Sequence, residues 1–321
     1  MTNTLFGFSV SSLSNLFFFN NDNPNQAITV HDGTFHADDV VAVAMIDLLC
    51  SSSGAAQPRI IRTRDESKFE GLVVDVGERE FDHHGSRSGI DADGIPYSGV
   101  SRVWEYFINA NKLEDSRAHQ LFKQRVLDPL SKIDNGQSLE AGEVSLFTFV
   151  PVFNPGYGDE EKLEQCFTNA VRVAREIILG AWAKCQADAH GEEALAEVVE
   201  QAQTKYVVDV PVGLDSLWPR ALAPTKAVFV IISAPDGTHY VQCVPEAPTE
   251  DKPFDAFSKK VPLPEAWAGK RDKDFAEVCG LDDAVFCHIG RFICGFKSHE
   301  SAELAATAAL VDDAADALLN G

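Results

Sequence analysis

The segment GLVVDVG, residues 71–77, constrains the fold of this chain more than any other stretch, because it is an apolar run broken by a single aspartate. A strand that is apolar at almost every position suits a parallel sheet covered on both faces. An apolar strand at 27–30, an apolar helix over 38–50 and a second strand, RIIRT at 59–63, precede it. This order of elements predicts an α/β domain with right-handed crossovers. Asp75 would then lie near the carboxyl end of its strand, where sites in such sheets form.

The rest of the chain passes from helices to strands. GVSRVWEYFINA and DSRAHQLFKQRVLDPLSKIDNG predict two helices, and residues 160–204 carry apolar residues at helical spacing. Past Val207, KAVFVIIS with THYVQCVP and AVFCHIG with RFICGF predict two hairpins. A closing alanine-rich helix is expected to be capped by Ser301, with Glu303 in its first turn. We therefore expect a domain boundary between residues 140 and 210.

Charge limits the kind of partner. The chain holds 27 Lys and Arg against 49 Asp and Glu, a formal net charge of −22. Such a protein repels phosphate backbones at long range. A polyanionic substrate would have to be held locally, by bound cations and a few arginines.

The sequence shows no recognisable targeting signal and its cysteines are scattered. Both observations favour a soluble protein in a reducing compartment, with the cytoplasm as the default. Residues 1–26 contain no Lys or Arg, which fits neither a secretory signal nor a mitochondrial transit peptide. They could form an added strand, a docking segment through Phe17–Phe19, or a weakly ordered tail. No apolar run approaches the ~18 residues of a membrane helix. Seven scattered cysteines form no C-x-x-C pair and no disulfide framework.

Acidic residues and histidines gather in four places at expected strand or helix ends. These are His31, His36 and Asp38; Asp75; Asp82, His83 and His84; and Asp134. Helix capping is an alternative for Asp38 and Asp39, and solvent exposure is an alternative for the two adjacent histidines. Together the clusters supply imidazoles and carboxylates, a mixture that suits Mn²⁺, Fe²⁺ or Zn²⁺ better than Ca²⁺ or Mg²⁺. They suffice for two ions that share one carboxylate, an arrangement used in phosphoryl chemistry.

A family resemblance follows from the order of these motifs. HDGTFHADD, RTRD, VVDVG, DHH and DNG, with FNPGY, QCVPEAP, LPEAWAGKRD and FCHIGRFICGF after them, resemble the Myg (melanocyte-proliferating-gene) exonuclease family of the DHH phosphoesterase superfamily. The resemblance covers about residues 27–310. It implies a two-lobed α/β fold, with a parallel-sheet N-terminal lobe and a smaller α/β C-terminal lobe that closes over the site. The expected organisation is an extension at 1–26, a catalytic metal-binding domain at 27–150, a helical connection at 151–206 and a substrate-binding lobe at 207–321.

The resemblance also implies roles for the clustered residues. One ion would be bound by His31, His36 and Asp75, and the other by Asp38, Asp75, His83 and Asp134, so that Asp75 bridges the two. His84 would face the substrate phosphate as a hydrogen-bond donor or acid, and Asp82 would orient a histidine. His36, where many superfamily members have an aspartate, favours Mn²⁺ over Mg²⁺.

Substrate contacts are expected at both ends of the chain. Arg62 and Arg64 could fork onto phosphate oxygens, although solvated arginines on a strand are the alternative. The family's C-terminal Gly-Gly-His turn is altered here, because Cys294 replaces a glycine and Phe296 replaces the histidine, while Gly295 remains. Phe296 could stack on a base or belong to the core.

The leading hypothesis is therefore a metal-dependent phosphodiesterase that uses two divalent ions, with Mn²⁺ preferred. Its expected activity is that of a 3′–5′ exonuclease on single-stranded RNA or short oligonucleotides. One alternative is a hydrolase of a small phosphate compound, such as a dinucleotide, nucleoside phosphate or pyrophosphate. Another is a non-catalytic metal-binding module with this fold. No membrane partner is expected, and the oligomeric state stays open, with a homodimer as one option.

Overall fold

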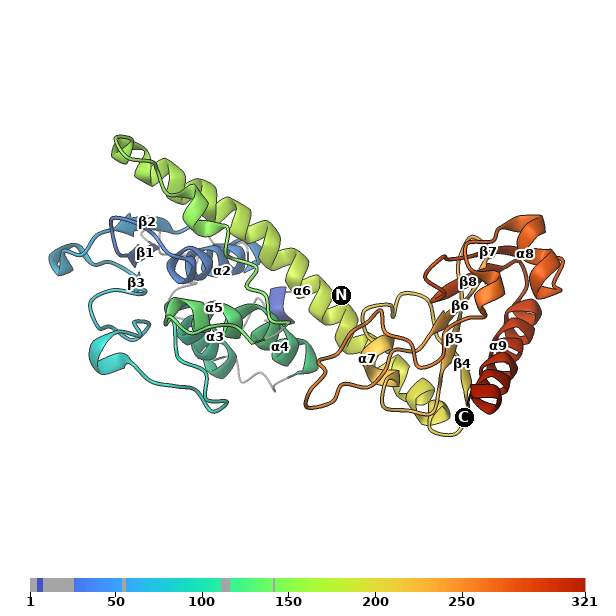
Figure 1. Ribbon diagram of the computed structural model, residues 1–321. Coiled ribbons are helices and arrows are strands. Elements are labelled where there is room, and N and C mark those ends of the chain that lie inside the picture. Colours follow the sequence, from blue (N-terminus) through green and yellow to red (C-terminus); the bar gives the residue numbers. More distant parts are fainter. Residues whose placement is uncertain (1–4, 8–25, 54–55, 111–115, 141, 321) are drawn as a thin grey trace. The chain divides into compact units, whose positions relative to one another are not determined.

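The computed structural model describes residues 5–7, 26–53, 56–110, 116–140 and 142–320 (Figure 1). The chain divides into an N-terminal unit, residues 1–187, and a C-terminal unit, residues 188–321. Helix α6 (Leu163–Ala202) crosses this boundary, and the helix expected over 160–204 is confirmed. In the described part of the chain, no helix has the length and apolar character needed to cross a membrane.

The N-terminal unit is an α/β structure, as expected. Its elements are η1 (Leu5–Gly7), β1 (Ala27–Val30), α2 (Ala37–Ser53), β2 (Arg59–Arg62), η2 (Glu66–Lys68), β3 (Leu72–Val73), η3 (Gly85–Arg87), α3 (Gly99–Ala110), α4 (Arg117–Phe122), η4 (Lys123–Leu127), α5 (Asp128–Asp134), η5 (Val150–Phe153), η6 (Glu160–Lys162) and the first part of α6. Strand β1 lies between β2 and β3, and both pairings are parallel. Helix α2 packs against α3 and α5, and its residues from Val40 to Ile46 are fully buried. A helix that is apolar all round suits such a position.

The strand expected over residues 71–77 is much shorter in the structure. The β1 ladder includes only Leu72 and Val73, after which Val74 forms an isolated bridge with Phe81. Asp75 follows with φ 55°, in the left-handed region. An L-residue rarely adopts this backbone, and it turns the chain out of the sheet. The apolar run predicted a longer strand because a hydrophobic pattern gives no sign of a single residue with a left-handed backbone conformation.

A π turn interrupts the long helix expected over residues 115–136. Residues Lys123–Leu127 form η4, a π turn between α4 and α5. Pro129 lies in the first turn of α5. Proline has no N–H and its ring clashes with the carbonyl four residues earlier, so a local π turn lets the helical path continue.

The described part of the N-terminal extension docks through one phenylalanine. The Phe6 ring is fully buried and makes edge contacts with Trp104, Phe122 and Trp182 at centroid distances of 5.1–5.3 Å. Its carbonyl oxygen lies 2.8 Å from His119 Nε2. Phe17–Phe19, expected as a docking segment, lie outside the described residues.

The C-terminal unit is a five-stranded mixed sheet with α9 against it. It contains the end of α6, β4 (Val207–Asp209), α7 (Trp218–Leu222), β5 (Phe229–Ser233), β6 (His239–Cys243), η7 (Glu265–Trp267), α8 (Asp272–Cys279), β7 (Ala284–Cys287), β8 (Ile293–Phe296) and α9 (His299–Asn320). The strand order is β4-β5-β6-β8-β7, with β4 parallel to β5 and the other pairs antiparallel. Both expected hairpins are confirmed. Four alanines of α9 are buried in the core of this unit: Ala302, Ala305, Ala306 and Ala309.

The cap expected for the closing helix was placed three residues too late. Helix α9 begins at His299, and the Ser301 N–H donates to Ser298 Oγ at 3.2 Å. Ser298 is thus the capping residue, and its hydroxyl also donates to Asp283 Oδ2 at 2.6 Å. The acidic residue of the first turn is Glu300 rather than Glu303.

Candidate metal centre

The clustered residues come from element ends that meet at one edge of the three-stranded sheet. His31 follows β1, Asp38 lies in the first turn of α2, and Asp75 follows β3. The carboxyl ends of parallel neighbours share an edge, so His31 and Asp75 come together. A loop supplies His83, and the last residue of α5 supplies Asp134.

The first ligand group consists of His31, His36 and Asp75, whose candidate ligand atoms lie within 4.8 Å of one another. His31 is buried, and its Nδ1 lies 2.9 Å from the Asp32 carbonyl oxygen. A proton on Nδ1 would donate to that carbonyl and leave Nε2 as a lone-pair donor for a metal. Nε2 lies 3.6 Å from Asp75 Oδ2.

The second ligand group surrounds His83. Its Nε2 lies 3.1 Å from Asp134 Oδ2, 3.2 Å from Asp75 Oδ1 and 3.6 Å from Asp38 Oδ2. The candidate ligand atoms of Asp38, His83 and Asp134 also lie within 4.8 Å of one another. Asp75 therefore directs one oxygen toward each histidine group.

Asp82 and His84 form a pair beside the two groups. His84 Nδ1 lies 2.8 Å from Asp82 Oδ1 and 3.4 Å from Asp75 Oδ1. Asp82 also accepts hydrogen bonds from the N–H groups of Glu78, at 2.7 Å, and His84, at 3.0 Å. Asp82 thus fixes the loop, while the His84 side chain is 64% exposed.

The electrostatics of this cluster call for positive charge. Burial raises the pKa of Asp38 and of Asp39 well above the usual range, and the nearby Asp75 carboxylate adds to this effect. Burial alone would lower the pKa of His83, but hydrogen bonds to Asp134 and Asp75 raise it to about 10. Carboxylates this close repel one another unless a proton or a metal ion lies between them.

Unpaired buried atoms test whether divalent ions fit. Three buried polar atoms of the cluster have no hydrogen-bond partner: His31 Nε2, Asp38 Oδ1 and Asp39 Oδ2. Two further buried oxygens, Asp75 Oδ1 and Asp134 Oδ2, both face the single Nε2 atom of His83. Burying such atoms without partners is unfavourable, and a bound cation satisfies them. The strained φ of Asp75 is also typical of a functional position. The residues present therefore fit divalent metal ions.

Asp39 has a second role beyond the capping that was expected. Its Oδ1 accepts hydrogen bonds from the His36 and Val40 N–H groups, at 3.0 and 2.7 Å, as a cap does. Its Oδ2 lies 3.3 Å from His31 Nε2. The adjacent acidic pair at the helix start was the only sequence signal for this contact.

Two cavities flank the cluster. One, of about 470 Å³, has a mostly polar lining that includes Arg64, Glu66 and Glu78. The other, of about 300 Å³, lies between the cluster and a wall from α5 and residues 145–151. Both are lined by His36, Asp75 and His84.

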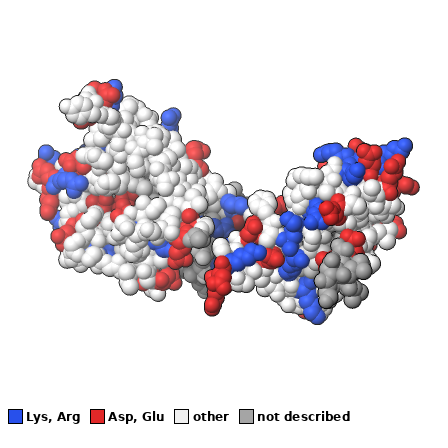
Figure 2. All heavy atoms as spheres, viewed as in Figure 1, with Lys and Arg blue, Asp and Glu red and all other residues white. Residues whose placement is uncertain are grey.

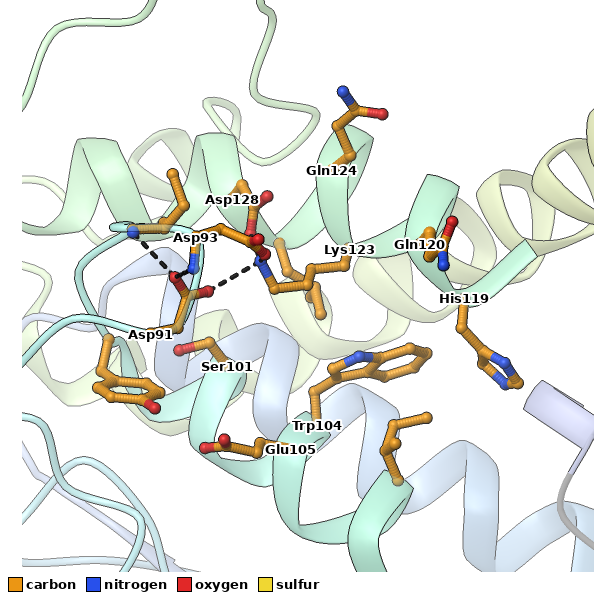
Figure 3. A pocket seen from close by; sticks show the side chains of 14 residues that line it. Asp91, Asp93, Ser101, Trp104, Glu105, His119, Gln120, Lys123, Gln124 and Asp128 are labelled. Atoms are coloured by element: carbon orange, nitrogen blue, oxygen red, sulfur yellow. Dashed lines mark hydrogen bonds and ion pairs between the residues drawn. The ribbon is translucent and has the colours of Figure 1, made fainter. Parts of the chain in front are cut away.

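A third cavity, of about 610 Å³, is larger but lies apart from the chemistry. Figure 3 shows Asp91, Asp93 and Asp128 around the Lys123 ammonium, at distances of 2.8, 2.8 and 3.0 Å. None of the clustered metal-ligand residues lines it. These three aspartates are paired with an internal cation, so size alone does not make the cavity the site.

The two arginines expected at the substrate have different positions. The expected contact of Arg62 with phosphate oxygens is corrected by the structure, because its side chain is only 1% exposed. The guanidinium donates hydrogen bonds to the Gly33 carbonyl at 2.5 Å and to Glu164 at 3.1 Å. Its guanidinium also lies 5.5 Å and 4.6 Å from the ring centroids of Phe35 and Phe167. It holds the loop between His31 and His36 and cannot reach a substrate.

Arg64 lines the polar cavity. Its side chain is 63% exposed, and its Nε lies 3.4 Å from Asp32 Oδ1.

Asn154, in the FNPGY segment, was missed as a site residue. Its Oδ1 accepts from the Phe35 N–H at 3.1 Å, and its Nδ2 donates to the Phe35 carbonyl at 2.9 Å. The loop that carries His31 and His36 is thus held by Asn154, a residue 119 positions after Phe35 in the chain.

The alternative that Phe296 stacks on a substrate base is wrong. Phe296 is fully buried and lies against the Phe275 ring at a centroid distance of 5.5 Å. Gly295 is buried on the same strand, where an added Cβ would lie 3.0 Å from the Phe286 ring. Residues 294–296 therefore belong to the core of the C-terminal unit.

The chain is similar to known proteins over most of its length. Residues 27–310 match the MYG1 exonuclease family model, described as an uncharacterised protein family (UPF0160). The human MYG1 exonuclease is 28% identical over 332 residues, covering 88% of this chain and 85% of that protein. The MYG1 protein of Dictyostelium discoideum is 24% identical, covering 87% and 94%. The RecJ structure from Thermus thermophilus in complex with Mg²⁺ matches at a TM-score of 0.29 and 13% identity, covering 97% of this chain and 53% of RecJ.

Proposed function

Because the chain belongs to the MYG1 exonuclease family, we propose that it is a metal-dependent phosphodiesterase that shortens single-stranded RNA or short oligonucleotides from the 3′ end. The observation that carries this proposal is the position of Asp75. Its Oδ2 lies 3.6 Å from His31 Nε2, and its Oδ1 lies 3.2 Å from His83 Nε2. One carboxylate that faces two ligand groups suits a pair of bridged ions.

The ligand assignment follows from the two groups. His31, His36 and Asp75 would hold one ion, and Asp38, Asp75, His83 and Asp134 would hold the other. Imidazole and carboxylate ligands in similar number favour Mn²⁺ among the available divalent metals.

Bound ions would supply an activated water and neutralise charge on the phosphate oxygens. In the hydrolysis, a bond forms between the water oxygen and phosphorus while the bond from phosphorus to the 3′ oxygen breaks. The departing 3′ oxygen takes a proton, and the terminal nucleotide leaves as a 5′-monophosphate.

Protein side chains assist this reaction beside the metal ligands. His84 Nδ1 is paired with Asp82, so its exposed ring can present Nε2 to a phosphate oxygen or to the departing oxygen. Arg64, exposed in the polar cavity, would pair with a phosphate oxygen.

A second candidate function is hydrolysis of a small phosphate compound, such as a dinucleotide or pyrophosphate. It is favoured by the charge of the polar cavity, where Arg64 is the single Lys or Arg among the described lining residues and Glu66, Glu78 and Asp82 are acidic. On the face of the N-terminal unit seen in Figure 2, basic side chains are isolated and form no broad field. Long nucleic acids usually need such a field.

A panel of labelled substrates tests the proposal. RNA and DNA oligomers labelled at either end, with a dinucleotide beside them, are incubated with Mn²⁺, Mg²⁺, Co²⁺ or EDTA. We expect stepwise shortening from the 3′ end of RNA with Mn²⁺, no reaction with EDTA, and no reaction for Asp75→Asn. Asp93→Asn, whose side chain is 69% exposed beside Lys123, is the matched control and should retain activity.

Three outcomes would contradict it. Cleavage of the dinucleotide with long oligomers untouched would establish the second candidate. Metal binding without hydrolysis of any substrate would indicate a non-catalytic module. Turnover by Asp75→Asn would rule out the bridging assignment.

We further propose that the protein is cytoplasmic. Support comes from its seven cysteines, which all lie in the described residues and form no disulfide there.

A further inference from the structure

The smaller cavity beside the metal centre has two chemically different sides. Toward the cluster it is lined by His36, Ala37, Asp75, His83, His84 and Asp134. The opposite side, here called the apolar wall, has Ile133, Thr148 and Pro151 at its exposed surface, backed by the buried residues Leu130, Ser145 and Phe147. Ile133 is 42% exposed although it is apolar, and Pro151 is exposed as well. An apolar surface that faces metal ligands suits a ligand with an apolar part next to an anionic one.

The two cavities would receive different parts of a substrate. Both cavities are lined by His36, Asp75 and His84, so a phosphate at the metal centre would lie where they meet. The polar cavity contains Arg64 and suits charged groups. The apolar wall lies on the other side, where a nucleoside attached to that phosphate could bury its base.

Building on the proposed function, we propose that the apolar wall binds the base of the 3′-terminal nucleotide, and that it does so without reading which base is present. Polar groups near the wall are engaged within the chain, because the Thr148 hydroxyl donates to the Ser145 carbonyl and the Phe147 N–H donates to Ser145 Oγ, both at 3.4 Å. Base identity is read by hydrogen bonds to base edges, whereas contact with a base face is sequence-tolerant. A cavity of about 300 Å³ receives one nucleoside at a time, which matches removal of single nucleotides.

Neighbouring apolar residues distinguish this cavity from a general docking surface. Val144 and Val152 are 66% and 82% exposed on the same segment, but neither lines the cavity. A partner that covered the whole segment would depend on these residues. A base in the cavity would depend on Ile133 and Thr148.

The test compares termini with and without a base in the full-length protein with Mn²⁺. Two RNA oligomers differ only at the 3′-terminal residue, which is either a normal nucleotide or an abasic ribose. We expect kcat/KM to be about tenfold higher for the normal terminus, which corresponds to about 1.4 kcal/mol. Ile133→Gln should bring this ratio close to one, and Val152→Gln, the matched control, should leave it unchanged.

Equilibrium binding gives a second readout. With Mn²⁺ present, calorimetry should give similar affinities for the four nucleoside 5′-monophosphates and about tenfold weaker binding of ribose 5-phosphate. Thr148→Phe fills the cavity from an exposed position and should weaken the monophosphates while leaving ribose 5-phosphate unchanged. Metal content, measured for each variant, shows whether Ile133→Gln has disturbed the neighbouring Asp134; if it has, Thr148→Phe alone decides the outcome.

Failures of the two proposals are distinguishable. If wild-type protein shortens RNA at equal rates with and without a terminal base, the inference about the wall is wrong and the proposed function stands. Equal effects of Ile133→Gln and Val152→Gln, or a preference for one base, also overturn the inference. If no oligomer is hydrolysed and nucleotides do not bind, the proposed function itself fails.

Discussion

Replacing Asn154 with leucine tests how the first ligand group is held. The Asn154 amide makes two hydrogen bonds to the backbone of Phe35, at 3.1 and 2.9 Å, and Phe35 is fully buried. Leucine has a similar size but offers neither bond, so a buried N–H and a buried carbonyl lose their partner. Each unpaired group costs about 1–3 kcal/mol.

The loop between His31 and His36 should relieve this loss by moving, and the metal affinity then falls. Outer partners of metal ligands typically change affinity by about 10- to 100-fold. That range equals about 1.4–2.8 kcal/mol, which does not exceed the loss of about 2–6 kcal/mol expected for two unpaired buried groups. We therefore predict about 10- to 100-fold weaker Mn²⁺ binding at one of two sites, with the other site unchanged.

Calorimetric titration of the metal-free protein with Mn²⁺ measures both sites at once. Asn109→Leu, at an exposed position on α3, is the matched control and should leave both affinities unchanged. Equal weakening of both sites, or no weakening of either, would refute a clamp that acts on the first ligand group alone.

Other predictions concern protonation and folding. The pKa values of Asp38, Asp39 and His83 are raised in the metal-free fold, so that fold binds more protons than the unfolded chain. The stability of the metal-free protein should therefore decrease as the pH rises from 6.5 toward about 10. Binding of Mn²⁺ at pH 7 should release protons, because the ligands must lose them. Thermal unfolding across pH and calorimetry in two buffers measure these effects, and a metal-free protein that becomes more stable over that range would contradict them. Lys260→Met removes an ammonium that donates to the Leu222, Thr225 and Ala227 carbonyls at 3.1, 2.7 and 2.8 Å, and should lower the free energy of unfolding by about 2–4 kcal/mol in urea titrations. Unchanged stability of this variant would mean that water replaces the ammonium. Phe6→Ala should lower the free energy of unfolding by about 3 kcal/mol or more, because the ring is fully buried among three aromatic rings; a loss below about 1 kcal/mol would show that the N-terminal segment contributes little to stability.

The sequence predicted those features that depend on local pattern. Continuous apolar runs identified the parallel strands, because a strand covered on both faces is apolar at almost every position. Pairs of strand-like runs joined by short turns identified both hairpins. The order of strands and helices also placed His31 and Asp75 at one sheet edge. Adjacent acidic residues at 38–39 were correctly interpreted as a helix start.

Features that depend on distant partners or on single backbone angles could not be predicted. The clamp on Phe35 joins residues 119 positions apart, and nothing near Asn154 signals it. Burial of Phe296, on strand β8, depends on Phe275 of helix α8. The left-handed φ of Asp75 is set by the site rather than by its apolar neighbours.

The position of a cap can also be ambiguous in sequence. The stretch SHES places serines at 298 and 301, and both suit a helix start. Only the hydrogen bond from the Ser301 N–H to Ser298 Oγ shows which of them lies outside the helix.

The central claim is that Asp75 belongs to both ligand groups, whereas His31 and Asp134 each belong to one. Metal content per chain after equilibration with Mn²⁺ tests this directly in three variants. We predict two ions in the wild type, one in His31→Gln, one in Asp134→Asn and none in Asp75→Asn. Retention of one ion by Asp75→Asn, with its affinity unchanged, would contradict the bridging role and with it the two-ion site.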